Sequence, residues 1–125
     1  MTDGLELAKY VLPAEIFRYF ELIKIEPEGG ELHLYLEELH DLPDGYSRGE
    51  LSSKDFHDEV VIKDFPIREQ PSFLHVRRRR RLEKSSGKTV SRNWELVAGG
   101  THYTQGFASF LKGFAGYLPD SHVFP

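Results

Sequence analysis

Five consecutive arginines, residues 77–81, are the side chains of this chain best suited to ionic binding chemistry. They follow Phe73-Leu74-His75-Val76, an apolar stretch typical of a β-strand. Guanidinium groups bind phosphate through charge-assisted, often paired hydrogen bonds, and the chain as a whole carries a net charge of −4. A dense positive segment on an acidic protein indicates a polyanionic partner, and nucleic acid is the first candidate.

The charge is divided unevenly along the chain. Residues 1–66 hold 6 Lys/Arg against 16 Asp/Glu, whereas residues 67–125 hold 10 against 4. This asymmetry predicts an interaction face in the second half. The alternative is that the two halves neutralise each other in the fold.

Other chemistry finds little support in the composition. The absence of cysteine excludes disulfides, thiolate zinc sites and a cysteine nucleophile. The six histidines show no ligand spacing, and no phosphate loop or nucleophile elbow is present. We therefore expect no enzyme activity, no catalytic residue, no metal and no cofactor. The N-terminus shows no secretory signal and no apolar run could span a bilayer, so the cytoplasm is the expected location.

The chain length suits a single domain over residues 1–125. We expect an acidic helix–hairpin–loop part at 1–58, a basic hairpin with a C-terminal helix at 59–117, and a tail at 118–125. The predicted class is α+β: a small, mostly antiparallel sheet of about five strands with helices at both ends. The apolar periodicity predicts helices at 5–11, 13–20 and 102–117, a hairpin at 21–36, an exposed loop at 38–55, and strands at 59–65, 72–82 and 89–97.

The positive side chains are placed by the hairpin register. A Ser85-Ser86-Gly87 loop sets Lys84 opposite Lys88 and Arg80 opposite Arg92. Alternate side chains then share a face about 7 Å apart, close to the phosphate spacing of nucleic acid. One row holds Arg77, Arg79 and Arg81, and the other holds Arg78, against Trp94, and Arg80; a slip of one residue exchanges the rows. The predicted contact residues are Arg77, Arg78, Arg79, Arg80, Arg81, Lys84, Lys88 and Arg92.

A neutralised arginine strand is the competing interpretation. Glu95 stands opposite Arg77 in this register, so the arginines could meet the chain's own carboxylates. Exposed ion pairs of this kind are weak, and five adjacent like charges repel one another. Polyanion binding is therefore the favoured hypothesis.

The order of motifs in residues 59–116 resembles the N-terminal region of bacterial insertion-sequence transposases. The segments that carry the likeness are Val61–Arg68, Phe73–Arg80, the Trp94-Glu95 pair and the helix expected from Thr104. The relevant type has a zinc ribbon ahead of a helix-turn-helix and a DDE catalytic domain. The first half, with Leu12–Ile16 and Gly29-Gly30, resembles the version made as a separate short protein. This chain departs from those relatives in having no cysteine pairs, so the second half is expected to be a degenerate zinc ribbon without metal.

The resemblance implies a non-catalytic DNA-binding or accessory subunit of a transposition system. It would bind double-stranded DNA through the arginine-rich hairpin and assemble with a separately encoded catalytic transposase. The alternative is a protein-interaction module whose arginines pair with acidic groups of a partner, without nucleic-acid binding. RNA binding is a third possibility.

Overall fold

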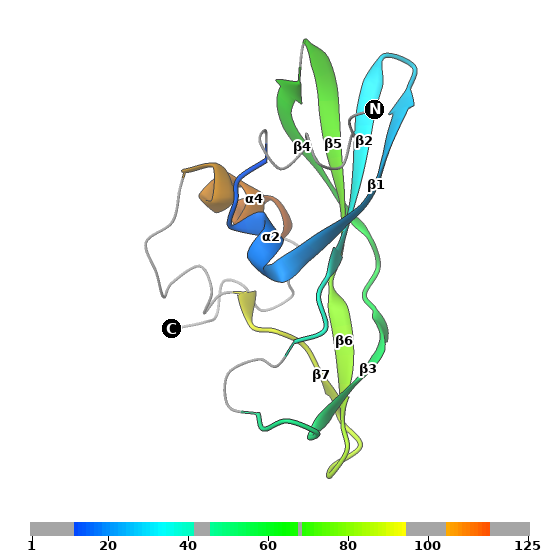
Figure 1. The fold of residues 1–125 in the computed structure, drawn as a ribbon, viewed down its shortest axis with the longest axis vertical. Helices are drawn as coiled ribbons and strands as arrows, with labels where there is room; N and C mark the ends of the chain where they lie inside the picture. Colours follow the sequence, from blue (N-terminus) through cyan, green and yellow to red (C-terminus); the bar gives the residue numbers. More distant parts are fainter. Residues whose placement is uncertain (1–11, 42–45, 68, 95–104, 116–125) are drawn as a thin grey trace, which may run out of the picture.

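The computed structural model describes residues 12–41, 46–67, 69–94 and 105–115. Within these ranges seven strands form two sheets, with two helices beside them (Figure 1), so the predicted α+β class with mostly antiparallel pairing is confirmed. The larger sheet has the order β1-β2-β5-β4 and the smaller sheet the order β3-β6-β7. The elements are α2 (Ile16–Tyr19), β1 (Phe20–Glu28), β2 (Glu31–Glu38), β3 (Leu51–Phe56), β4 (Val60–Ile67), β5 (Gln70–Arg77), β6 (Arg79–Glu83), β7 (Thr89–Val90) and α4 (Gln105–Ala115).

The first hairpin forms where the sequence predicts it. Gly29 and Gly30 connect β1 to β2 with φ angles of 57° and 83°. Positive φ at both loop residues is the type I′ geometry that fits the twist of a tight hairpin, and glycine reaches it without strain. Along β2, Leu34 and Leu36 are buried while His33 and Tyr35 are only partly buried. The alternation therefore sets one face of the larger sheet against the core.

A long antiparallel ribbon connects the two sheets. Strands β4 and β5 pair in the larger sheet, and β3 and β6 pair in the smaller one. Between these ladders the His57 amide donates to the Arg78 carbonyl at 2.8 Å, so the pairing continues across the junction. Figure 1 shows this ribbon along the long axis, with β4 and β5 at one end and β3 and β6 at the other. The predicted single strand 72–82 is therefore two strands that change sheet at Arg78.

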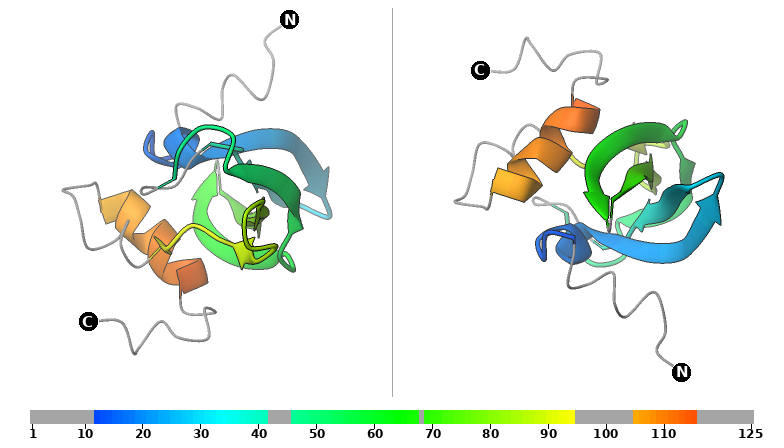
Figure 2. Two further views of the ribbon diagram at one scale, coloured as in Figure 1. Left: turned by 90° about the horizontal axis from the view of Figure 1, so that it is seen from below. Right: turned by 90° about the horizontal axis from the view of Figure 1, so that it is seen from above.

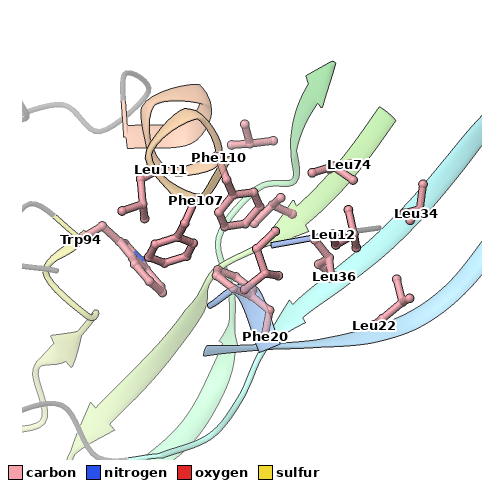
Figure 3. Close-up of a cluster of buried hydrophobic side chains, with 13 residues drawn as sticks. Leu12, Phe20, Leu22, Leu34, Leu36, Leu74, Trp94, Phe107, Phe110 and Leu111 are labelled. Atoms are coloured by element: carbon pink, nitrogen blue, oxygen red, sulfur yellow. The ribbon is translucent and has the colours of Figure 1, made fainter. Parts of the chain in front are cut away.

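The core lies between the helices and one face of the larger sheet. Phe20 stacks on Trp94 with ring centroids 5.2 Å apart and meets Phe110 edge-on at 5.4 Å. Figure 3 shows Phe107, Phe110 and Leu111 pointing from α4 towards the sheet. Seen along the long axis, both helices lie on the same side of the curled strands (Figure 2). Trp94 is thus a core residue, 1% exposed. The guanidinium that lies over its ring is that of Arg92, and not that of Arg78 as predicted.

Several predicted boundaries are wrong. The helix expected at 13–20 is reduced to α2, because Phe20 already begins β1. The expected loop 38–55 contains most of β3, which pairs with β6. Within the described part of the strand expected at 89–97, residues 89–94, only β7 is a strand, and Trp94 lies beyond it. The helix expected at 102–117 is described as α4, whereas the helix at 5–11 and the tail 118–125 lie outside the described residues.

Close packing of α4 on β4 gives a test of the fold. A Cβ atom on Gly113 would lie 2.7 Å from Cγ2 of Ile62. We expect Gly113→Ala to lower the free energy of unfolding by about 1–3 kcal/mol through overpacking, although alanine at an open helical position would raise it by about 1 kcal/mol. Lys112→Ala, at an exposed position of the same helix, should change the unfolding midpoint in urea very little. A stabilising effect of Gly113→Ala would contradict the packing.

Candidate nucleic-acid interface

The arginine run lies at the junction of the two sheets, where most of its members meet carboxylates of this chain. Arg77 ends β5, and its Nη1 donates to Glu37 Oε2 at 2.6 Å. The same guanidinium lies over the Phe56 ring at 4.3 Å. Its side chain remains 43% exposed, so the contact is a partly hydrated ion pair and not a buried one.

Arg79 is fixed to the end of β2 by two hydrogen bonds. Its backbone amide donates to Glu38 Oε1 at 2.9 Å, and its Nε donates to the Glu38 carbonyl at 3.0 Å. Nη1 also donates to the Ser53 hydroxyl. The guanidinium lies over the Phe56 ring at 4.6 Å, on which Arg77 also lies. These contacts restrict Arg79 to one orientation.

Arg80 forms the paired geometry that arginine and carboxylate favour. Its Nε and Nη2 donate to the two oxygens of Asp55 at 2.5 and 2.8 Å. The hydrogen bonds hold the pKa of Asp55 below, and the pKa of Arg80 above, their ordinary values. About a third of the Arg80 side chain is exposed, so water and salt weaken this pair.

Arg81 is completely buried. Its Nη2 donates to Glu38 Oε2 at 3.1 Å, to the Leu39 carbonyl at 2.9 Å and to Asp41 Oδ1 at 3.4 Å. Arg92 reaches the same two carboxylates, with Nε 3.3 Å from Glu38 Oε2 and Nη2 on Asp41. We call these four charged groups the junction cluster: Glu38, Asp41, Arg81 and Arg92. Burial of a carboxylate is tolerated here because two guanidinium groups compensate its charge.

Arg78 is buried at the point where the ribbon changes sheet, with 9% of its surface exposed. Burial lowers its pKa, and the nearby Glu38 carboxylate opposes that shift.

Two histidines near the arginine run have lowered pKa values for similar reasons. Burial lowers the pKa of His57, with Arg78 and Arg80 adding to the effect, and burial lowers the pKa of His40, with Arg81 and Arg79 adding.

The predicted row of Arg77, Arg79 and Arg81 is therefore wrong. In the hairpin, Arg81 pairs with Val90 and the Glu83 amide bonds to the Lys88 carbonyl, one residue away from the predicted register. Gly87 lies in the loop as predicted and has a left-handed φ of 73°, but the loop spans residues 84–87 instead of 85–87. The break at Arg78 also interrupts the alternation, so Arg78 and Arg81 are both buried. Neither side chain can contact a phosphate in this structure.

Positive side chains do reach solvent at the far end of the smaller sheet. We call this region the distal tip: residues 47–50 and 83–88, together with Lys54 on β3. The Lys84 amide donates to the Glu50 carbonyl at 3.0 Å, which brings the two loops together. The acids of the tip accept other hydrogen bonds, Glu50 from the Ser47 amide and Glu83 from the Ser86 hydroxyl. The exposed cations of the tip are Arg48, Lys54, Lys84 and Lys88.

Charge is separated along the long axis. Residues 46–57 and 78–92, which include the smaller sheet, hold nine Lys/Arg against three Asp/Glu. Residues 16–38 and 60–77, which include the larger sheet, hold five against eight. Among the described residues, Lys84 and Lys88 form no ion pair with a carboxylate. The distal tip therefore has an excess of positive charge, with the cations Arg48, Lys54, Lys84 and Lys88 against the acids Glu50 and Glu83.

Comparisons with known proteins add no relative. The chain matches no family model, no curated protein and no solved structure. Within the described ranges, no group of three potential metal ligands is arranged around a common point. No helix in the same part of the chain is long and apolar enough to cross a bilayer.

Some residues of the distal tip and the junction cluster are predictable from the sequence and others are not. Lys84 and Lys88 were among the predicted contacts, and the structure leaves both exposed. Arg48 and Lys54 were missed because they fall in the segment predicted as a loop. Glu38 and Asp41 were missed because they belong to an acidic stretch with no feature to distinguish a buried carboxylate from a solvated one.

The junction cluster predicts unequal effects for two similar substitutions. Glu38→Gln should lower the free energy of unfolding by about 3–5 kcal/mol, because Arg81 would keep its buried charge with a weaker partner. Asp55→Asn makes the same chemical change at an exposed pair, and should leave the midpoint of urea unfolding nearly unchanged. Equal midpoints for the two variants would show that the buried pair does not stabilise the junction.

Proposed function

We propose that this protein is a non-catalytic DNA-binding or accessory subunit of a DNA transposition system. It contacts the phosphates of double-stranded DNA with the exposed cations of the distal tip. The observation that carries the proposal is the pair Lys84 and Lys88, which project from a hairpin loop without carboxylate partners among the described residues. Free ammonium groups on a protruding hairpin suit backbone contacts, which need charge but no fixed base-reading geometry.

The resemblance of residues 59–116 to insertion-sequence transposases supports the transposition context. In those relatives the tip of the corresponding hairpin carries metal ligands, whereas here it carries Lys84, Ser85, Ser86, Gly87 and Lys88. A separately encoded catalytic transposase is the partner that this proposal implies. A cytoplasmic location, where bacterial DNA is accessible, also belongs to the proposal.

In this proposal the arginine run does not act as a row of direct phosphate contacts. Arg81 and Arg92 hold the smaller sheet to the end of β2 through Glu38. This fixes the direction in which the distal tip projects from the larger sheet. Arg77 and Arg80, whose ion pairs are partly exposed, can add phosphate contacts by exchanging their carboxylate partners.

A second candidate function is a protein-interaction module, and one observation favours it. Arg77 and Arg80 already bind carboxylates while 43% and 34% of their side chains stay exposed. Acidic side chains of a partner protein could replace Glu37 and Asp55 by the same hydrogen bonds. In this case the protein would bind an acidic partner and would show no affinity for DNA.

Salt dependence of DNA binding tests the proposal. Contacts with three to four phosphates predict a log–log slope of affinity against salt of about −3 between roughly 50 and 200 mM. Lys84→Ala/Lys88→Ala should make this slope shallower by about 2, because each lost phosphate contact removes about 0.9. Fluorescence anisotropy of a labelled duplex measures both values, with single-stranded RNA as a competitor.

The matched control is Lys63→Ala/Lys112→Ala. It removes two exposed lysines of the same charge that lie on β4 and α4, away from the distal tip. The control should keep the slope of the unmodified protein. Equal losses in the two double variants would place the contacts elsewhere, and no binding even at low salt would favour the protein-interaction module.

A further inference from the structure

Four titratable side chains form a continuous hydrogen-bonded chain across the face of the larger sheet that carries no helix. His33 Nε2 lies 3.1 Å from Glu31 Oε1, and His33 Nδ1 lies 2.7 Å from His75 Nε2. At the other end, His75 Nδ1 lies 2.8 Å from Glu59 Oε1. The two histidines come from neighbouring parallel strands, β2 and β5, and Glu59 immediately precedes β4.

The number of hydrogens shared by these four side chains follows from the geometry of their hydrogen bonds. Three links need three hydrogens, one in each gap. Ionised Glu31 and Glu59 only accept hydrogen bonds, and each neutral histidine supplies one N–H group. With both histidines neutral, two hydrogens are present and one link has two facing lone pairs. With both histidines protonated, four hydrogens are present and two N–H groups face each other in the middle.

The surroundings of His33 and His75 accommodate one positive charge on this histidine pair. The Phe73 ring stacks on His33 with centroids 5.3 Å apart, and the Tyr35 ring stacks on His75 at 4.3 Å. Stacked aromatic rings stabilise a cation through their negative faces. The side chains of His33 and His75 are only 16% and 13% exposed, so water replaces the links poorly.

Other charged groups on this face come from every neighbouring strand. On β1, Glu26 lies opposite His33 in the strand register, and Lys24 lies over the Tyr35 ring. The pKa of Tyr35 is raised by burial and then by Glu26, so its hydroxyl stays neutral. Glu28 of β1 also raises the pKa of Tyr35. Lys63 of β4 lies opposite Phe73, and Glu37 and Arg77 form an ion pair.

We propose that His33 and His75 form a proton-binding site that holds one excess proton between two carboxylates. This proton supplies the third hydrogen and completes the links between β2, β5 and the residue before β4. The site is independent of the distal tip, so it stands whether or not the protein binds DNA. It makes the larger sheet responsive to pH on both sides of about pH 6.5.

The sign of the pH effect follows from proton counts. Two unfolded histidines together bind about one proton near pH 6.5, fewer above it and nearly two well below it. The folded site holds one proton over this range. Folding therefore takes up a proton when the pH rises above about 6.5 and releases one when it falls below. The factor by which the site shifts the equilibrium towards the folded state is greatest near pH 6.5. On either side this factor falls with pH, at a rate that approaches about tenfold per pH unit.

Nitrogen-15 NMR of the intact protein tests the proton count directly. At pH 6.5 we expect His33 Nε2 and His75 Nδ1 to be protonated at the same time, with a single hydrogen shared between His33 Nδ1 and His75 Nε2. A bare His33 Nε2 or a bare His75 Nδ1 at this pH, with the carboxylates ionised, would overturn the proposal. This measurement needs no substitution and so does not depend on a variant that folds.

A difference in stability provides a second test. Subtracting the pH profile of His33→Gln/His75→Gln from that of the unmodified protein should give a bell centred near pH 6.5. His57→Gln is the control, since burial lowers the pKa of His57 and its removal should give a one-sided difference at low pH. Glu59→Gln keeps an acceptor but removes a charge, and should move the high-pH side of the bell to lower pH. A flat or one-sided profile for the double variant would overturn the proposal.

Discussion

The fold depends on one buried carboxylate. Glu38 is the last residue of β2 in the larger sheet, and only 1% of it is exposed. Its side chain accepts hydrogen bonds from the Arg79 amide, Arg81 and Arg92, all of which belong to the smaller sheet or the segment after it. A carboxylate without partners would be too costly to bury in this position. The smaller sheet therefore sits against the end of β2 because its guanidinium groups compensate this charge.

The same constraint divides the positive residues into two groups. Arg78 and Arg81 are buried, and Arg79 and Arg92 are held by hydrogen bonds to Glu38. The lysines of the distal tip extend into water. An arginine run and scattered surface lysines usually suggest the opposite division, with the run as the binding surface. Here the planar guanidinium group, with its five donors, makes arginine the better residue for compensating buried acids.

Local patterns in the sequence predicted the parts of the fold that depend on local rules. Gly29 and Gly30 fit the predicted first hairpin, and the apolar periodicity of residues 102–117 indicated α4, on which Phe107 and Phe110 are buried. The parallel pairing of β2 with β5 was not predictable, because no turn fixes strands so distant in sequence. Which of the arginines face solvent was also not predictable. It depends on the β6–β7 loop, which is one residue longer than predicted, and on the strand break at Arg78. Lys84 and Lys88 of the distal tip followed from the expected hairpin, whereas Arg48 and Lys54 of the same tip and the burial of Glu38 had no signal in the sequence.

The parallel pair at the centre of the larger sheet has a consequence for how the chain reaches its folded state. Leu32 pairs with Ser72, and every other partner in this ladder is likewise 40 residues away. Hairpins close early because their ends are near in sequence, while a ladder between distant segments must wait for a large loop to close. The β1–β2 and β4–β5 hairpins are therefore the natural early units, and their docking along β2 and β5 is the slow, order-determining event. The carboxylate at the end of β2 becomes buried only in that late step, after its arginine partners have been brought within reach.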